Sequence, residues 1–409
     1  MASRLASRMS KSPLSRTEFV ALLSLTTSLT ALSIDAILPA LQAIGQAFTV
    51  ANANDTQFIV TLFILGMVFG EILFGPLSDA IGRKRAILAG LLIYCIGTLV
   101  AMAAFSFEQV IIGRIIQGIG VSGPKIASRA LIRDLYEGRA MARIMSFIFM
   151  VFILVPMLAP ALGQGVMLVA GWRAIFILFL VLAAVVALWL GLRQPETLTP
   201  ERRIRLSPST LFSNAVLIVR HAKVMAYTLS AGLIFGALLL YVSTAQAIFI
   251  DLYDAGDRFP LYFAMLASGV GVASFSNGQL VMRYGMHRLT VIALGGLIFF
   301  AGALLVVASQ TEGIPSFPVF MGLFFLMFFN FGLLFGNLNA MAMESLGRVA
   351  GLGASVIASV SSLLAVALSV SVGRFYDQTV IPLAVGFILA GALSLVLVLA
   401  ANRSSAGEV

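Results

Sequence analysis

Twelve long apolar segments constrain the fold of this chain more than any other feature. Of its 409 residues, 60% are hydrophobic and 11% are charged, whereas soluble domains carry about 25% charged residues. A helix of about 20 apolar residues crosses the hydrocarbon core of a bilayer. The sequence therefore predicts an all-α integral membrane protein with twelve transmembrane helices. The segments lie at residues 18–43, 55–78, 85–105, 108–133, 141–166, 173–192, 223–250, 259–283, 288–309, 316–344, 351–373 and 379–402.

The positive charges predict how these helices are oriented. Twenty-one of the 26 Lys and Arg residues lie in the tails and in the loops after segments 2, 4, 6, 8 and 10. Loops rich in Lys and Arg stay in the cytoplasm, so both termini, residues 1–17 and 403–409, are predicted to be cytoplasmic tails. The basic N-terminus lacks the apolar stretch and cleavage site of a signal peptide. We therefore attribute the net charge of +9 to membrane topology and expect no nucleic-acid partner.

A polar stretch at 193–222 divides the segments into an N-terminal half (18–192) and a C-terminal half (223–402). The halves share a sequence echo: residues 75–85 read GPLSDAIGRKR and residues 278–288 read GQLVMRYGMHR. Each has two glycines seven residues apart and an arginine three residues after the second glycine. The echo predicts two pseudo-symmetric six-helix halves, the layout of transporters that bind substrate where the repeats meet.

Asp35 lies in a first segment that is otherwise almost free of charge. A carboxylate within a membrane costs about 2.5–3.5 kcal/mol on insertion scales, and binding a proton removes that cost. Asp35 is therefore the main candidate for proton coupling. Arg114 in segment 4 is predicted at a similar depth, given a rise of about 1.5 Å per residue. It either shifts the balance between the charged and neutral forms of Asp35 or forms a static ion pair with it.

Glu71 and Lys125 are two further charges within segments. Glu71 lies eight residues outward from Asp79, and Lys125 lies eight residues outward from Arg133. Both are therefore predicted at one depth in the inner half of the membrane, where they would pair if segments 2 and 4 are neighbours. The pair is either a second protonation site, with Glu71 taking part in coupling, or a case of mutual neutralisation.

Three motifs resemble signatures of the major facilitator superfamily. The first is the 75–85 loop, the second is RIIQGIG at 114–120, and the third, PMLAPALG at 156–163, resembles the antiporter motif of the fifth helix. The resemblance implies roles in moving the two halves, including a charge latch between Asp79 and the basic residues that reaches the opposite half. Ala80 stands where the family usually has a basic residue. The residues with implied conformational roles are Gly75, Asp79, Gly82, Arg83, Lys84, Arg85, Pro156, Pro160 and Gly163.

Three further stretches resemble the Bcr/CflA drug–proton antiporters within that superfamily. They read DAILPAL at 35–41, RALIRDLY at 129–136, and NAMAME at 339–344, followed by Ala350 and Gly351. The resemblance implies a monomer in the bacterial inner membrane that exports diverse small organic compounds in exchange for protons. Ile37 replaces a common aromatic residue, which leaves the substrate range open.

The resemblance to the major facilitator superfamily implies that segments 1, 4, 7 and 10 line a central cavity. The candidate substrate contacts are therefore Asp35, Tyr241, Asn330 and Asn337. Tyrosine and asparagine side chains in membrane helices also form hydrogen bonds between helices, which is the alternative role of the last three residues. The phenylalanines of segment 10 are predicted to be mostly lipid-facing or packing residues.

Other functions remain as alternatives. A proton-coupled importer or exporter of a metabolite, such as an amino acid or a sulfur compound, would use the same fold and acids. A membrane enzyme would need clustered His, Cys or paired carboxylates, and a sensor would need a soluble signalling domain. The single cysteine, Cys95, and the two histidines, His221 and His287 at segment ends, give no such cluster. We therefore predict no catalytic residue, metal or cofactor.

Overall fold

The computed structural model describes residues 14–136, 138–203, 216, 218–344 and 350–406. Within these ranges the chain forms twelve helices of 20 residues or more and no β-strand. They are α2 (Arg16–Asp35), α4 (Phe58–Ile81), α5 (Arg83–Met102), α6 (Phe107–Leu135), α7 (Gly138–Ala170), α8 (Arg173–Arg193), α10 (Ala222–Ala247), α11 (Phe259–Tyr284), α12 (Met286–Gln310), α13 (Phe317–Met343), α14 (Ala350–Gly373) and α15 (Ile381–Ala406). The predicted twelve-helix, all-α architecture is confirmed. Most of the predicted N-terminal tail, the middle of the linker and the last residues of the C-terminal tail lie outside the described residues.

Ten helical stretches are long and apolar enough to cross a membrane. The other two long helices are α6 and α7. Helix α6 carries Arg114, Lys125 and Arg129 within its length, and it is more polar than the rest. In α7, Leu154–Ala170 forms a shorter apolar helix. Both complete the bundle, because α6 packs against α4 and α5, and α7 packs against α2.

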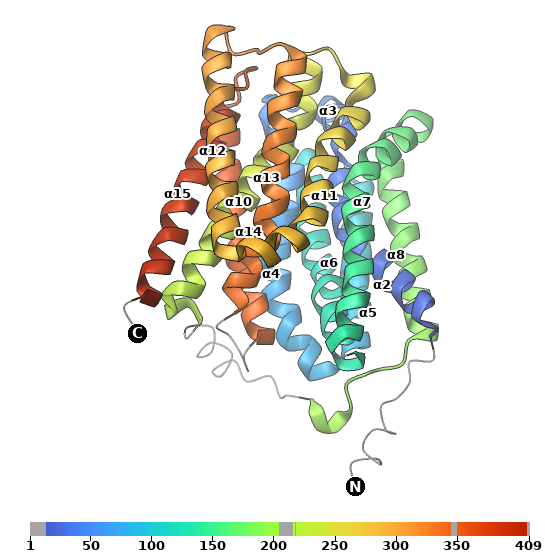
Figure 1. Ribbon diagram of the computed structural model, residues 1–409. Coiled ribbons are helices and arrows are strands. Elements are labelled where there is room, and N and C mark those ends of the chain that lie inside the picture. Colours follow the sequence, from blue (N-terminus) through green and yellow to red (C-terminus); the bar gives the residue numbers. More distant parts are fainter. Residues whose placement is uncertain (1–13, 137, 204–215, 217, 345–349, 407–409) are drawn as a thin grey trace.

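The helices form two groups, α2–α8 and α10–α15, that stand side by side (Figure 1). Helix α2 begins and α15 ends at the same end of the bundle, which is the lower end in Figure 1. We call the opposite end the upper end. The two halves meet chiefly where α4 packs against α14 and where α7 packs against α11.

The sequence echo corresponds to one tight turn in each half. Helix α4 ends at Ile81 and α5 starts at Arg83, so Gly82 alone connects them, with φ of 109°. In the second half Gly285 connects α11 and α12, with φ of 77°. Positive φ favours glycine because it has no Cβ. The predicted 75–85 loop is thus wrong in extent, since residues 75–81 continue α4.

The first segment is broken, whereas the sequence analysis treats it as one helix at 18–43. Helix α2 ends at Asp35 and is followed by a 3-10 turn, η2 (Leu38–Ala40), and by the short helix α3 (Leu41–Ala47). Pro39 accounts for the break because its ring would clash with the carbonyl of Asp35, four residues earlier, in a continuous helix. Irregular backbone at membrane depth is tolerated where protein buries it or where it lines a water-filled cavity, and Ala36, Ile37 and Leu38 are completely buried.

Segment 7 is also irregular at the upper end of the bundle. Helix α10 stops at Ala247, and a π-helical turn, η5 (Ile248–Leu252), follows it. Gln246, the penultimate residue of α10, hydrogen-bonds to the backbone of the broken first segment. The irregular ends of segments 1 and 7, one from each half, therefore lie against each other.

Candidate functional site

Asp35 is the last residue of α2, and only 6% of its surface is exposed. Among the described residues, no side chain forms an ion pair or a hydrogen bond with its carboxyl group. Burial has removed most of the water around this group. The neighbouring backbone is tightly packed, because a Cβ atom at Gly163 of α7 would collide with the carbonyl oxygen of Ala36. The glycine of the antiporter-like motif therefore lets α7 touch the chain directly beside Asp35.

Arg114 is completely buried in α6. Its Nε donates to the carbonyl of Ile59 at 2.9 Å, and one Nη donates to the carbonyl of Ser33 at 2.8 Å. The other Nη donates to Gln117 Oε1 at 2.5 Å, and the guanidinium carbon lies 4.3 Å from the centre of the Phe63 ring. The predicted ion pair between Arg114 and Asp35 is absent from the described contacts. Arg114 instead holds the backbone of α2 two residues before Asp35.

Glu71 and Lys125 form the ion pair that their helical depths predict. Lys125 Nζ lies 2.5 Å from Glu71 Oε1, and the Glu71 side chain is fully buried. The second carboxylate oxygen accepts a weak hydrogen bond, 3.5 Å long, from Ser362 of α14. One turn away, Ser359 of α14 donates to the carbonyl of Val68 at 3.4 Å. The pair therefore also contacts the opposite half, which the depths of the two residues do not predict.

The charge cluster at the lower end is centred on Arg83. Its guanidinium pairs with Asp79 and with Asp134 at the end of α6, the latter at 2.9 Å. Its backbone N–H donates to Glu196 Oε1 at 2.8 Å, and Lys84 Nζ donates to the carbonyl of Gly191 at 2.7 Å. Arg85 is exposed.

The described contacts of this latch lie on its own side of the bundle, and its reach to the opposite half stays a prediction. All of these partners belong to the N-terminal half or to the residues just after α8. Asp134 accepts from Arg83 Nε, Asp79 and Ser78 accept from one Nη, and Glu196 accepts from the backbone N–H. Gly75 of this motif lies against the other half, because a Cβ at this position would collide with the Ser355 hydroxyl of α14.

The antiporter-like motif of segment 5 lies inside one helix. Pro156 and Pro160 are both within α7, which is a single helical element from Gly138 to Ala170. The helix contacts α2 in its own half and α11 in the other. The motif therefore lies where the broken first segment and the opposite half both meet α7.

Tyr241 is completely buried in α10 among aromatic rings. Its ring lies 4.9 Å from that of Phe328, 5.4 Å from that of Phe324 and 5.9 Å from that of Phe263. Its hydroxyl has no hydrogen-bond partner among the described residues. Four of the eight phenylalanines of α13 are packing residues in the core: Phe320, Phe324, Phe328 and Phe331.

The two amide candidates of α13 contact neighbouring residues of the bundle. Asn337 exchanges two hydrogen bonds with Asn277 of α11, 3.0 and 3.2 Å long. Asn330 donates to the carbonyl of Leu326 in its own helix, and its amide lies against Gly296 of α12. The helix-packing alternative therefore accounts for both side chains, and no described contact joins either of them to Asp35 or Tyr241.

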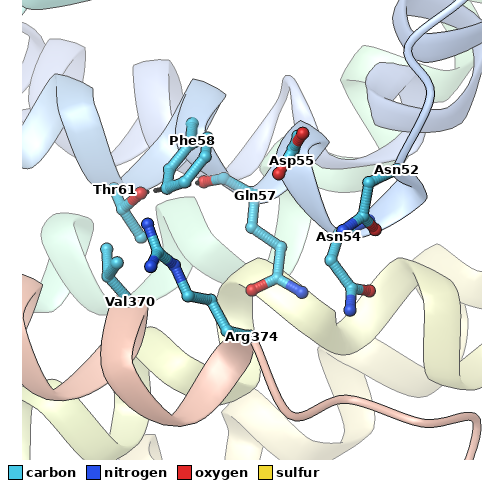
Figure 2. A pocket seen from close by; sticks show the side chains of 8 residues that line it. All are labelled: Asn52, Asn54, Asp55, Gln57, Phe58, Thr61, Val370 and Arg374. Carbon is cyan, nitrogen blue, oxygen red and sulfur yellow. Dashed lines mark hydrogen bonds between the residues drawn. The ribbon is translucent and has the colours of Figure 1, made fainter.

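Two cavities lie between the halves at the upper end. The larger, of about 390 Å³, is bounded by the broken first segment and α7 on one side and by segments 7 and 8 on the other. The smaller, of about 300 Å³, lies between the start of α4 and the end of α14, with Asp55, Gln57 and Arg374 in its lining (Figure 2). Neither lining includes Asp35. The described residues hold no cluster of His, Cys, Asp and Glu that suits a metal ion.

Two six-helix halves that meet around buried ionisable residues define a secondary membrane transporter. The chain belongs to the Major Facilitator Superfamily, whose family model matches residues 23–369. The recognition of this family from its motifs is confirmed, and so is the prediction of a transporter rather than an enzyme.

Drug-resistance proteins are among the relatives. A bicyclomycin resistance protein homolog of Haemophilus influenzae is 29% identical over 84% of this chain and 85% of its own length. A chloramphenicol resistance protein of Pseudomonas aeruginosa is 29% identical over 73% of this chain and 70% of its own. Multidrug resistance protein D of Escherichia coli is 27% identical over 75% of this chain and 79% of its own length. These relatives agree with the resemblance to the Bcr/CflA proteins.

Solved structures support the fold alone. The crystal structure of a D-xylose–proton symporter superposes with a TM-score of 0.72 at 16% identity, covering 92% of this chain and 97% of the symporter. The crystal structure of the human organic anion transporter MFSD10 superposes with a TM-score of 0.68 at 19% identity, covering 94% of this chain and 99% of the transporter.

Proposed function

We propose that this protein exports small organic compounds across a bacterial inner membrane in exchange for protons. The observation that carries the proposal is Asp35, a buried carboxyl group without a partner among the described residues, at a break in the first helix. Intramembrane acids of this kind mark proton relays and substrate paths. The drug-resistance relatives favour export over import. We place both termini in the cytoplasm because of the charge bias, which makes the upper end the outer one.

In this mechanism Asp35 alternates between two tasks. The ionised carboxylate attracts a cationic or polar compound from the cytoplasm, because an isolated charge at membrane depth is costly. Protonation from the outside removes that attraction and releases the compound. Arg114 positions the site by holding the Ser33 carbonyl in α2. Gly163 transmits movement of α7 to the chain beside Asp35, since the two backbones are in contact there.

The Glu71–Lys125 pair has a separate role in this proposal. Its contact with Ser362 is made across the α4–α14 interface and changes when the halves move apart. The pair either takes up a second proton when that contact is lost or remains ionised and keeps the interface neutral. The stoichiometry of transport distinguishes these two roles.

Proton movement in proteoliposomes tests the proposal. The vesicles contain a pH-sensitive dye, a proton gradient is imposed, and a panel of cationic and neutral drugs is added. We expect compound-triggered proton movement that Asp35→Asn reduces to the level of empty vesicles. Asp55→Asn is the matched control, because Asp55 lies at the upper end in the smaller cavity, and it should behave like the wild type.

The other outcomes have distinct meanings. Movement that survives Asp35→Asn would transfer coupling to Glu71 or another group. A wild type that responds to no drug would contradict drug export, and a screen of amino acids and sulfur compounds would then follow.

A further inference from the structure

Gln246 joins the two halves of the protein at the break that follows Asp35. Its Nε2 donates to the carbonyl oxygen of Pro39 at 2.6 Å, and its Oε1 accepts from the backbone N–H of Gln42 at 3.2 Å. Only 7% of the glutamine is exposed. A single buried amide thus makes two hydrogen bonds to a backbone segment 204 to 207 residues away in the sequence.

The break after Asp35 explains why these backbone groups are available. Gln42 is the second residue of α3, and the first N–H groups of a helix have no partner within that helix. Pro39 lies in the 3-10 turn before it. Gln246 supplies one acceptor and one donor, which match the free N–H and the free carbonyl. When the halves separate at this end, both backbone groups lose these partners and need water instead.

The larger upper cavity lies on the other side of this contact. Pro39, Gln42 and Gln246 all contribute to its lining, and Asp35 precedes Pro39 by four residues. The lining contains Asp254 and Asp257 and no basic residue. A passage with this charge is suited to a cation.

We propose that Gln246 is the gating residue between Asp35 and the upper cavity. Its amide closes the path while the halves are together at the upper end, and separation of the two hydrogen bonds opens the path. This inference rests on alternating movement of the halves and needs no particular substrate. It therefore stands or falls independently of the proposed drug export.

The test measures how far the halves are apart at the upper end without any substrate. Spin labels are attached to Ala51→Cys and Phe375→Cys, two exposed sites at that end, one in each half, in a Cys95→Ser protein. Electron–electron resonance then gives the distance distribution in lipid nanodiscs. Gln246→Met keeps the length and bulk of the side chain but removes both hydrogen bonds. We expect the ratio of separated to closed upper ends to rise about tenfold, the effect of losing two modest hydrogen bonds.

Two further variants separate gating from packing. Gln46→Met is the matched control, since Gln46 is an exposed glutamine of the same cavity lining, and its distribution should equal that of the wild type. Gln246→Glu, measured at a pH high enough to ionise it, can still accept from Gln42 but its carboxylate cannot donate to Pro39, so the separated population should also rise. A wild-type distribution in Gln246→Met would overturn the proposal, because a packing role needs only the bulk that methionine keeps. An equal shift in Gln46→Met would overturn it as well. If Gln246→Met fails to fold, Gln246→Glu is used in its place, and a wild-type distance distribution in that variant would overturn the proposal.

Discussion

The two halves share a fold and a repeated turn, yet they bury different chemistry. Among the described residues, the buried charged side chains are Asp35, Glu71, Arg83 and Arg114, and all of them belong to the N-terminal half. The C-terminal half buries neutral hydroxyls, amides and a cluster of aromatic rings around Tyr241. Buried carboxyl groups can gain or lose a proton, whereas aromatic rings contribute area and shape. The comparison suggests that one half carries the proton chemistry and the other shapes the space beside it.

The repeated turns differ in the same way. In the N-terminal half the turn is anchored by the Arg83 ion pairs and by the close contact of Gly75 with Ser355. At the equivalent positions of the C-terminal half, Gly278 has open space around its Cα. Gly285 keeps the positive φ of Gly82. The two turns thus share positive φ at the connecting glycine, while the interactions around them differ.

The largest effect should come from breaking the charged pair of the N-terminal half. Glu71→Gln leaves the Lys125 ammonium without its partner, which costs roughly 3 kcal/mol for a buried pair. Adding Lys125→Ser removes the stranded charge, so the double variant should recover both thermal stability in detergent and transport. A double variant no better than either single variant would disprove the pairing. The neutral pair Asn277–Asn337 is the comparison. A double-mutant cycle that replaces each asparagine by alanine should give a smaller coupling free energy, about 0.5–1 kcal/mol.

The repeated glycines test the comparison at matched positions. Gly75→Ala places a methyl group against Ser355, so we expect a loss of about 1–3 kcal/mol from overpacking and slower transport. Gly278→Ala points into open space and should stay within about 0.5 kcal/mol of the wild type. Melting temperatures and initial transport rates of the two variants check this. Equal losses would mean that the α4–α14 contact does not distinguish the halves.

The smallest effect on stability should come from Tyr241→Phe. The Tyr241 hydroxyl has no hydrogen-bond partner among the described residues. Its removal should therefore change the free energy of unfolding by less than about 0.5 kcal/mol. If Tyr241 contacts the transported compound through this hydroxyl, substrate KM should rise while the melting temperature stays constant. A clear drop in melting temperature would instead reveal a structural hydrogen bond and would remove Tyr241 from the candidate contacts. Tyr227→Phe, a buried tyrosine near the lower end of the same helix, serves as the control.

Patterns local in the sequence determined much of this protein. Apolar segment lengths predicted the twelve helices, and the two glycines seven residues apart predicted the repeated turn. The common depth of Glu71 and Lys125 followed from counting helical residues, because the constant rise of an α-helix converts sequence position into depth. That segments 2 and 4 are neighbours was implied by the family resemblance. Even the break after Asp35 has a local cause in Pro39, although the length of the apolar segment by itself predicts one continuous helix.

The tertiary structure alone decided which groups meet across long stretches of chain. Nothing local indicated that Arg114 would bind the carbonyls of Ile59 and Ser33 in place of Asp35, that Glu196 would engage the turn before Arg83, or that Gln246 would reach Pro39, 207 residues away. Helical periodicity specifies the face and depth of a side chain. It does not specify which neighbouring helix that face meets, because the neighbour is chosen by the packing of the whole bundle.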